Sequence, residues 1–385
     1  MDKRIYLSSP HMGGKEEDFI KEAFETNWIA PLGPNENEFE KEITSYVGVK
    51  GGLALSSGTS AIHLALKAVG VKEGDIVFCS SLTFAASCNP IMYEKAIPVF
   101  IDSEAESYNM SAKALEKAFR YYEEKGQRVK AVIVVHLYGQ SCDMDKIMEL
   151  CNKYGAEIIE DAAESLGATY KGKQTGTFGK FGIYSFNGNK IITTSGGGML
   201  VSDDVEKIEK ARFWSTQARE NRPYYHHKEL GYNYRMSNVV AGIGRGQILV
   251  LNERITKKKE IFEAYKEAFK DIEEIKMSKT QDYGEPNYWL STMTISEESN
   301  INPKDMLEAL EKENIEGRHI WKPMHMQPYY EKFEFFNHNG EGQGKNQISE
   351  SQKIFERGVC LPSDTKMTRQ EQDQVIKIIR SLFNK

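Results

Sequence analysis

Lys190 is the residue of this chain whose setting best suits covalent chemistry. It follows a short apolar run and lies among small, polar and glycine residues, in the segment Ser185-Phe186-Asn187-Gly188-Asn189-Lys190-Ile191-Ile192-Thr193-Thr194-Ser195-Gly196-Gly197-Gly198. An amine in such a loop suits a covalent bond to a cofactor aldehyde. The alternative is that Lys190 is a solvated surface lysine. The chain has 50 Lys and Arg residues, and most residues of these types lie on protein surfaces.

Asp161 lies upstream of Lys190 and ends an apolar run, 156–160, that predicts a buried strand. Site residues of open parallel sheets gather at the carboxyl ends of strands. A carboxylate there can keep a pyridine nitrogen protonated, and the ring then serves as an electron sink. Asp161 could instead cap a helix. Glu164 could lie beside the phenolic oxygen of such a ring or belong to a capping box.

A third group of residues, Ser56-Ser57-Gly58-Thr59-Ser60, follows a strand-like run and opens a predicted helix. Backbone N–H groups and hydroxyls converge there on a helix end that attracts anions, so this segment is a candidate phosphate cradle. It could equally be an ordinary N-cap. Phe84 could stack on a planar cofactor or belong to the core. An acid, a lysine and a phosphate cradle are the parts of a pyridoxal phosphate (PLP) enzyme.

Composition narrows the class of protein and its partners. The 385 residues are 40% hydrophobic and 28% charged, which is typical of a soluble globular chain with a sizeable core. The net charge is -6, and the basic and acidic residues are mixed along the sequence, so we expect no nucleic acid partner. We find no apolar signal segment or bilayer-length run, and we expect neither a membrane nor a metal. Five cysteines without C-x-x-C spacing indicate reduced thiols in the cytoplasm: Cys79, Cys88, Cys142, Cys151 and Cys360.

Short apolar runs that alternate with helical patterns must position these residues. From Gly51 onward the runs are β-branched and nearly continuous, which predicts strands buried on both faces of a parallel sheet in an α/β domain. A helix of residues 18–26 and a break at 27–35 precede them. The predicted strands are 53–55, 75–79, 98–102, 131–137, 156–160, 181–186 and 198–202.

The character of the sequence changes near residue 252, where a long, highly charged helix (253–270) begins. We expect a large domain of residues 1–250 with an N-terminal arm and a smaller C-terminal α+β domain of residues 251–385. A mobile loop is predicted at 333–345. The other predicted elements of this part are strands at 288–295 and 318–321 and helices at 303–314 and 369–383.

Jointly, these motifs resemble the DegT/StrS-type nucleotide-sugar aminotransferases, which are fold-type I PLP enzymes. The resemblance runs nearly end to end and implies a mostly parallel central sheet between helices, with a smaller C-terminal α+β domain. The motifs that carry it are Ser57-Gly58-Thr59, Thr83-Phe84, Glu160-Asp161-Ala162-Ala163-Glu164-Ser165-Leu166-Gly167-Ala168, Ser185-Phe186, Lys190 with Thr193-Thr194, and Gly231-Tyr232-Asn233-Tyr234-Arg235-Met236-Ser237.

The resemblance also implies roles for single residues in binding the cofactor. Lys190 corresponds to the Schiff-base lysine and Asp161 to the partner of the pyridine nitrogen. Glu164 stands near the ring oxygen, where many relatives have Gln or His. Asn233 corresponds to a residue that reaches the phosphate from the neighbouring subunit, which implies a homodimer with shared active sites. The other cofactor contacts that it implies are Phe84 on the ring and Ser57, Gly58, Thr59 and Ser185 around the phosphate.

Substrates are implied in the same way. The donor is L-glutamate and the acceptor a nucleotide-linked keto sugar, with Arg235, Arg318, His319, Trp321 and His325 as candidate contacts and the loop at Trp28 as a pocket wall. The segments 187–189 and 193–198 resemble the branch that aminates UDP-linked 4-keto-6-deoxy-N-acetylhexosamines at C4 for surface glycans, as in bacillosamine-type pathways. A dTDP- or GDP-linked sugar, aminated at C3 or C4, is the alternative.

Three other activities fit the residues less well. A sister group that dehydrates sugars has histidine in place of the lysine, so Lys190 argues against dehydration. A non-catalytic regulator with a PLP fold would be expected to lack Lys190 or Asp161. A PLP enzyme could also desulfurate or decarboxylate an amino acid; a desulfurase needs a cysteine on a mobile loop, whereas Cys360 lies in a predicted strand, 358–362.

Overall fold

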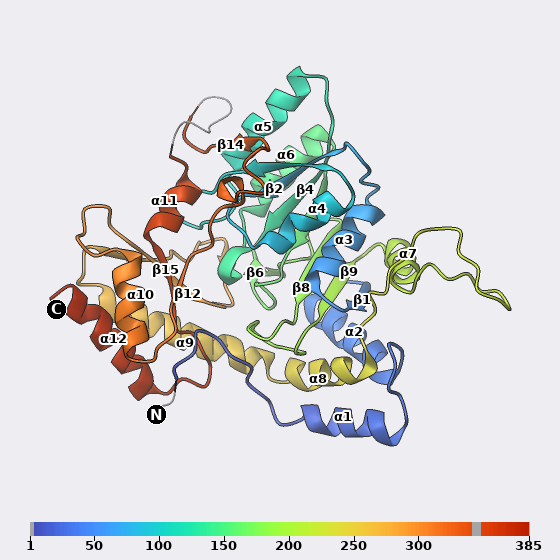
Figure 1. Cartoon of the computed structure of the whole chain (residues 1–385), viewed down its shortest axis with the longest axis horizontal. Helices are drawn as coiled ribbons and strands as arrows, with labels where there is room; N and C mark the ends of the chain where they lie inside the picture. Colours follow the sequence, from blue (N-terminus) through green and yellow to red (C-terminus); the bar gives the residue numbers. More distant parts are fainter. Residues whose placement is uncertain (1–3, 341–347, 385) are drawn as a thin grey trace.

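The computed structural model describes residues 4–340 and 348–384. At its centre is a sheet of eight strands in the order β1-β9-β8-β5-β4-β2-β3-β14 (Figure 1). Neighbouring strands pair in parallel except at β9, which pairs antiparallel with β8 and β1. This confirms the predicted α/β fold with a mostly parallel sheet. The strands are β1 (Gly51–Leu55), β2 (Ile76–Ser80), β3 (Ile97–Ile101), β4 (Val129–Val135), β5 (Glu157–Asp161), β8 (Phe181–Ser185), β9 (Gly198–Ser202) and β14 (Phe335–Phe336).

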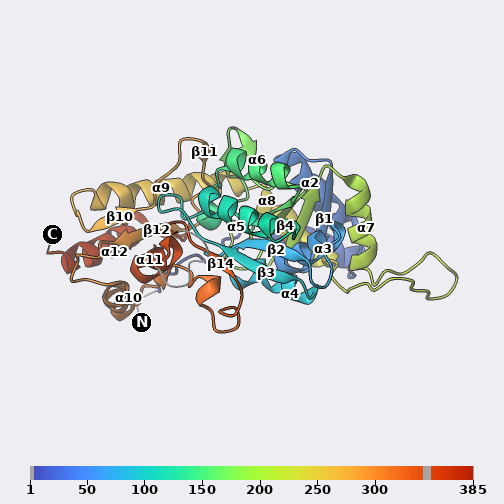
Figure 2. The ribbon, with the colours of Figure 1, turned by 90° about the horizontal axis from the view of Figure 1, so that it is seen from above.

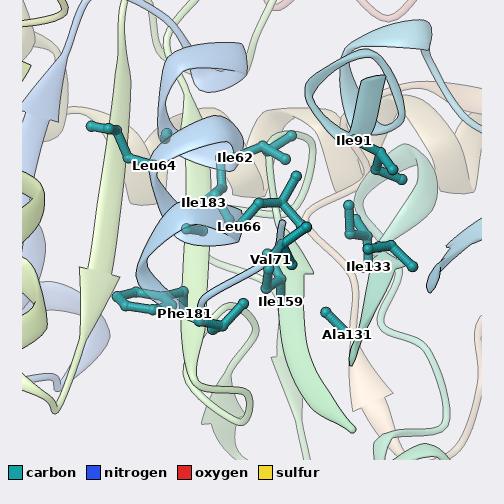
Figure 3. Packing of buried hydrophobic residues seen from close by; sticks show 14 of the residues in the cluster. Ile62, Leu64, Leu66, Val71, Ile91, Ala131, Ile133, Ile159, Phe181 and Ile183 are labelled. Carbon is teal, nitrogen blue, oxygen red and sulfur yellow. The ribbon is translucent and has the colours of Figure 1, made fainter. Parts of the chain in front are cut away.

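One face of this sheet packs against α3 (Gly58–Ala68). Ile159 of β5 and Ile183 of β8 lie beside Ile62 and Leu66 of the helix, and all four side chains are buried (Figure 3). Side chains at every second strand position point to the same face, which is why these isoleucines meet α3. The packing fixes the start of α3 against the carboxyl ends of the central strands.

The opposite face packs against α5 (Ala112–Glu124) and α6 (Met144–Tyr154) (Figures 1 and 2). Phe78 and Val132, the alternate residues of β2 and β4, contribute to this second core. The strands are therefore buried on both sides, as their continuous apolar runs predict. The remaining helices of this part are α1 (Glu16–Glu25), α2 (Pro34–Val47), α4 (Asn89–Tyr93), α7 (Val205–Ser215) and α8 (Asn238–Ile248).

A second, antiparallel sheet of four strands forms the core of the C-terminal part, in the order β10-β12-β15-β13. Helices pack on it and close a separate apolar core. Its elements are β10 (Ile275–Met277), β12 (Ser291–Ile295), β13 (Arg318–His319), β15 (Gly358–Leu361), α9 (Leu251–Phe269), α10 (Pro303–Lys312), α11 (Glu350–Arg357) and α12 (Arg369–Leu382). A small third sheet joins β6 (Thr169–Tyr170), β7 (Lys173–Gln174) and β11 (Gly284–Glu285).

The N-terminal arm and α12, near the two ends of the described residues, both lie at the C-terminal part (Figure 1). Ile5 forms a bridge with Ile315 and is buried in the C-terminal core. The N-terminal arm therefore packs on the C-terminal part, whereas β14 returns to the large sheet. The division at residue 250 stays a prediction. No helix within residues 4–340 and 348–384 is both long and apolar enough to cross a membrane.

The prediction of a mobile loop at 333–345 is wrong at residues 335 and 336, whereas residues 333–334 and 337–340 form neither helix nor strand. Phe335 and Phe336 form β14, pair in parallel with β3 and are buried. Two residues show no periodicity of their own, because this strand exists only through its partner from a distant part of the sequence. The end of the predicted loop, 341–347, lies outside the described residues.

Asp102, directly after β3, binds the backbone at residue 338 and at the start of α11. Its buried carboxylate accepts hydrogen bonds from the His338 N–H at 2.9 Å, the Glu350 N–H at 3.1 Å and the Ser351 N–H at 3.0 Å. The same carboxylate thus receives the first N–H groups of α11, which lead on to β15 of the small sheet. A strand of the large sheet is in this way tied to the C-terminal part.

Candidate active site

Eight of the nine predicted cofactor residues meet in one cavity of about 430 Å³, at the carboxyl ends of the parallel strands and the start of α3. Its wall also includes Trp289, Arg318 and Trp321 from the C-terminal part. Both sheets therefore contribute to the site. The predicted residues that line it are Ser57, Gly58, Thr59, Phe84, Asp161, Glu164, Ser185 and Lys190.

Lys190 is not a solvated surface lysine, since its side chain is 13% exposed. The loop after β8 carries it into the cavity, and its own N–H donates to the Asn187 carbonyl at 3.0 Å. Its Nζ lies 3.6 Å from Oε1 of Glu164 and 4.1 Å from the centre of the Trp289 ring. The amine is thus held between a carboxylate and an aromatic face.

Asp161 ends β5 and is buried on the cavity wall. Ser87 donates its hydroxyl to Oδ2 at 2.6 Å, and the Ala163 N–H donates to Oδ1 at 3.2 Å. Residues 163–167 form turns, so Asp161 does not cap a helix and Glu164 does not belong to a capping box. These two donors fix the orientation of a carboxylate that faces the cavity.

Glu164 is also buried, and its Oε2 accepts a hydrogen bond from the Tyr138 N–H at 2.7 Å. Burial raises the pKa of this carboxyl group, while the nearby Lys190 ammonium and the Tyr138 N–H act in the opposite direction. Glu164 is therefore the acidic partner of Lys190 in this structure.

The cradle combines a helix N-terminus with the close approach of Gly198 to the backbone of Ser57 and Gly58. Ser57 is indeed the N-cap of α3, and its hydroxyl accepts from the Ser60 N–H at 3.0 Å. The cap and the cradle coincide, because Gly58 opens the helix on the cavity wall. A Cβ at Gly58 would lie in ordinary contact with Ser185 Cβ, at 3.4 Å, whereas one at Gly198 would collide with the backbone of Ser57 and Gly58. Glycine at position 198 therefore lets β9 pass close to the anion-attracting helix end.

Phe84 is 56% exposed and does not belong to the core. Its ring lies 5.5 Å from that of Trp321, which stacks on Tyr138 at 6.1 Å; Tyr138 in turn stacks on Trp289 at 6.2 Å. A row of aromatic rings therefore runs from Phe84 to the ring that faces Lys190. Such a row suits a planar ligand.

Arg235, a predicted substrate contact, does not line this cavity, and Asn233, which is predicted to reach the phosphate in the neighbouring subunit, does not line the cavity of its own chain. The Arg235 side chain is 6% exposed, pairs with Glu36, and has Nη1 3.3 Å from Glu40 Oε1. Burial lowers the pKa of Arg235 to about 10. Asn233 is exposed, because its neighbours Tyr232 and Tyr234 stack on each other at 4.9 Å and face inward.

His319, His325 and Trp28 also lie away from the cavity wall. His319 is exposed and alternates along β13 with Arg318, which does face the cavity. The His325 ring stacks on Phe335 at 3.7 Å, and its Nδ1 is 2.7 Å from the Ser81 hydroxyl oxygen. The exposed Trp28 uses its carbonyl to accept a hydrogen bond from Asn238 at 3.0 Å.

Two residues that sequence reasoning missed touch the key side chains. Ser87 orients Asp161 and lies three residues after Phe84, which the sequence predicted as a cofactor contact. Trp289 covers the Lys190 amine from a distant part of the chain. Its sequence neighbourhood reads as an ordinary strand, so no local signal marks it.

These residues fit the PLP that the resemblance implies. The Asp161 carboxylate, the Lys190 amine and the α3 N-terminus open on one cavity, with the exposed Phe84 ring beside them. A larger cavity, of about 610 Å³, lies elsewhere and is lined by Glu106, Glu274, Lys279 and Arg357 among others. Lys279 pairs with Glu106, and Arg357 donates to backbone carbonyls. Lys190, Asp161 and the start of α3 all line the smaller cavity and not this one, so we place the chemistry in the smaller cavity.

Comparisons with known proteins agree with this geometry. The DegT/DnrJ/EryC1/StrS aminotransferase family matches residues 10–380. The "Putative pyridoxal phosphate-dependent aminotransferase EpsN" of Bacillus subtilis (strain 168) is 53% identical over 384 residues, covering 100% of this chain and 97% of that protein. A GDP-perosamine synthase of Caulobacter vibrioides is 36% identical, over 85% of this chain and 87% of that protein.

A UDP-4-amino-4,6-dideoxy-N-acetyl-beta-L-altrosamine transaminase of Campylobacter jejuni is 30% identical, over 92% of this chain and 91% of that protein. Among solved structures, a DegT DnrJ EryC1 StrS aminotransferase from Brucella abortus superposes with a TM-score of 0.88 at 27% identity, over 96% of each chain. A lysine, an acid and a helix N-terminus around one cavity are what such an enzyme requires. The chain belongs to the DegT/DnrJ/EryC1/StrS aminotransferase family and is a PLP-dependent sugar aminotransferase.

Proposed function

We propose that this enzyme transfers the amino group of L-glutamate to the C4 ketone of a UDP-linked 4-keto-6-deoxy-N-acetylhexosamine, in the cytoplasm, for surface glycan biosynthesis. The observation that carries the proposal is the cavity in which the Lys190 amine, the Asp161 carboxylate and the start of α3 face one another. The loop residues 187–198 support the acceptor, as does the relative named a UDP-4-amino-4,6-dideoxy-N-acetyl-beta-L-altrosamine transaminase.

When bound, PLP supplies an aldehyde that takes up the amino group and a ring that takes up electrons. Asp161, oriented by Ser87, would hold a proton at the pyridine nitrogen. The N–H groups at the start of α3 and the nearby Ser185 would hold the phosphate. Lys190 would anchor the cofactor and, once released, would move the proton of the glutamate α-carbon to the cofactor; in the second half-reaction it would move a proton from the cofactor to the sugar carbon.

Arg318 is the residue that we propose for the anionic groups of the substrates. It lines the cavity from β13, and its Nη2 and Nε lie 2.7 and 3.0 Å from Oε1 of Glu316. A guanidinium group binds carboxylates and phosphates through paired N–H donors. Its place on the wall favours Arg318 over its neighbour His319 for this task.

A homodimer with shared sites is also part of the proposal. Asn233 is exposed, while Tyr232 and Tyr234 turn toward His63: the Tyr232 and His63 rings are 4.8 Å apart, and Tyr234 Oη is 3.1 Å from His63 Nδ1. Neighbours that face inward leave Asn233 facing away from its own core. We propose that it reaches the phosphate in the site of a second copy.

The second candidate acceptor is a GDP-linked keto sugar. The relative named GDP-perosamine synthase is more similar to this chain, at 36% identity, than the relative whose name contains a UDP-sugar, at 30%. The two candidates differ in the nucleotide and in the acetamido group of the sugar. A panel of acceptors therefore decides between them.

The test uses the purified enzyme loaded with PLP. The protein should be yellow, and borohydride should fix the cofactor on the peptide that contains Lys190. L-glutamate should bleach the colour, and the correct keto sugar should restore it. UDP-, GDP- and dTDP-linked sugars with the ketone at C4 or C3 are compared, with Lys190→Ala as the control that fixes no cofactor.

Each step of this test can contradict one part of the proposal. If glutamate leaves the spectrum unchanged, the donor is wrong. If a GDP-linked sugar restores the colour and no UDP-linked sugar does, the second candidate replaces the first. A cofactor fixed on a lysine other than Lys190 would overturn the assignment of the site itself.

A further inference from the structure

We propose that Trp289 is the positioning residue of Lys190, holding the peptide group before the lysine with its indole N–H and the terminal amine with its ring face. This inference rests on the proposed role of Lys190 as the anchor of the cofactor. Trp289 belongs to the C-terminal part of the chain, whereas Lys190 belongs to the loop after β8. The position of the amine is then set by a residue from a distant part of the chain.

The contacts of Trp289 reach both ends of the lysine residue. Its Nε1–H donates to the Asn189 carbonyl at 2.7 Å, which fixes the peptide bond between Asn189 and Lys190. The centre of its ring lies 4.1 Å from Lys190 Nζ, within the range of cation–π attraction. A lysine side chain has many rotamers, so fixing only one end would leave the amine free to move.

Trp289 is itself fixed on three sides. Its side chain is buried and stacks on Tyr138 at 6.2 Å. Its N–H donates to Asn287 Oδ1 at 2.9 Å, and its carbonyl accepts from Lys258 Nζ at 2.8 Å. Lys258, which is 2% exposed, also donates to the Ser363 carbonyl at 2.8 Å. The indole therefore has little freedom to turn away from Lys190.

The N-terminal arm adds a second donor to the same carbonyl. Ser8 Oγ donates to the Asn189 carbonyl at 3.1 Å and lies 3.4 Å from Lys258 Nζ. Two segments from outside the loop thus meet at Asn189. A carbonyl with two donors is held more firmly than one with either donor alone, so removal of either donor should loosen the loop.

An aromatic face also suits the task of an amine that must move. Lys190 has to anchor the cofactor and later carry a proton between two carbon atoms. The ring attracts the ammonium without accepting a directed hydrogen bond, whereas Glu164, at 3.6 Å, is a charged acceptor. Trp289 thereby keeps the amine in the cavity without locking it to one partner.

The experiment separates the two contacts. Trp289→Phe keeps an aromatic face but lacks the N–H donor, and Trp289→Leu lacks both. Trp214→Phe is the matched control, because Trp214 is another buried tryptophan whose Nε1–H donates to a side chain, Glu229 Oε2 at 2.8 Å, away from the cavity. Ser8→Ala removes the arm's donor without altering the core.

The first readout is hydrogen exchange of residues 187–191 in the protein without cofactor. Trp289→Phe should speed exchange of these amides about tenfold, the change that corresponds to one ordinary hydrogen bond. Ser8→Ala should have a smaller effect in the same direction, and Trp214→Phe none. If exchange is unchanged in both Trp289→Phe and Ser8→Ala, the proposal is overturned. Both substitutions are mild, so this result can be obtained even if Trp289→Leu does not fold.

The second readout is the fraction of bound cofactor that borohydride fixes, measured beside the total phosphate bound. Trp289→Leu should lower the fixed fraction several-fold while the total stays near that of the wild type, because the α3 cradle is intact. A general loss of structure would lower both. If the wild type itself fixes no cofactor at Lys190, the proposed function fails, whereas the exchange result still decides the role of Trp289.

Discussion

The Lys190 ammonium lies between a carboxylate and an aromatic ring, and these two neighbours act on it differently. Glu164 attracts the charge directly at 3.6 Å. Burial raises the pKa of Glu164, so this carboxyl group releases its proton less readily than an exposed one. Relatives with Gln or His at this position would lack that acidic partner. Glu164 therefore gives the free Lys190 amine a second binding partner in addition to the Trp289 ring.

Asp161→Asn is expected to slow transamination by about 100-fold or more, a loss of about 2.7 kcal/mol of transition-state stabilisation. An amide does not hold the pyridine nitrogen protonated, although it fills the same space beside Ser87. The cofactor should still bind and be fixed at Lys190. Steady-state kinetics with glutamate and the preferred acceptor measure the effect.

Two further variants serve as comparisons for the effect of Asp161→Asn on the rate. Ser87→Ala should cost far less, about tenfold or below, because it removes one of two donors and leaves the charge. Asp145→Asn, at an exposed ion pair with Lys171, should be close to the wild type. An Asp161→Asn enzyme with nearly full activity would show that the carboxylate has another task.

Residue types and positions pointed to Lys190, Asp161 and the segment 56–60 as candidates, and the family resemblance added the other residues that meet in the cavity. Asp161 ends β5, Gly58 opens α3 after β1, and Lys190 lies in the loop after β8. The carboxyl ends of parallel strands bring such positions to one edge of a sheet. Substrate contacts were harder to predict. His319 and Arg318 are neighbours in sequence, and only the side to which β13 turns decides that Arg318 faces the cavity.

At the scale of elements, the predictions hold where an element carries its own pattern. The central strands and the charged helix α9 have continuous or periodic signals and appear close to their predicted bounds. β14 and the Ser8–Asn189 contact depend on partners from distant parts of the sequence; Ser8 and Asn189 are 181 positions apart. No local pattern encodes such contacts, so sequence periodicity cannot find them.

Lys258 on α9 should make the free energy of unfolding depend on pH. Burial lowers the pKa of its amine from 10.5 to about 7. Between these values the unfolded chain holds a proton that the folded chain has lost, so the free energy of unfolding should rise with pH. Urea unfolding between pH 7 and 10 should show wild type gaining on Lys258→Met by up to about 1.4 kcal/mol per pH unit.

The control for this measurement is Lys266→Met on the same helix. Lys266 is exposed and lies 3.7 Å from Glu263, so its removal should shift the stability curve by a constant amount. If Lys258→Met also runs parallel to the wild type across the window, Lys258 keeps its proton in the folded chain. The ammonium would then donate to all three of its oxygen neighbours at every pH tested.

At the scale of the whole molecule, the cavity has contributions from two sheets and, in our proposal, from two chains. Trp289, Arg318 and Trp321 reach the wall from the C-terminal part. Asn233 faces away from its own core. A substrate bound there would contact both parts of one chain and the surface of another. Assembly would then be a requirement for activity rather than an addition to it.

Mixing two inactive variants tests this arrangement. Lys190→Ala removes the anchor and Asn233→Ala removes the proposed contact from the second copy, so each homodimer has only damaged sites. Random exchange of equal amounts gives about half heterodimers, each with one intact site and one doubly damaged site, and about one quarter of wild-type activity should return. If Asn233 instead serves the site of its own chain, every site in the mixture carries one of the two changes. The activity would then stay at the mean of the two variants, and the shared site would be wrong.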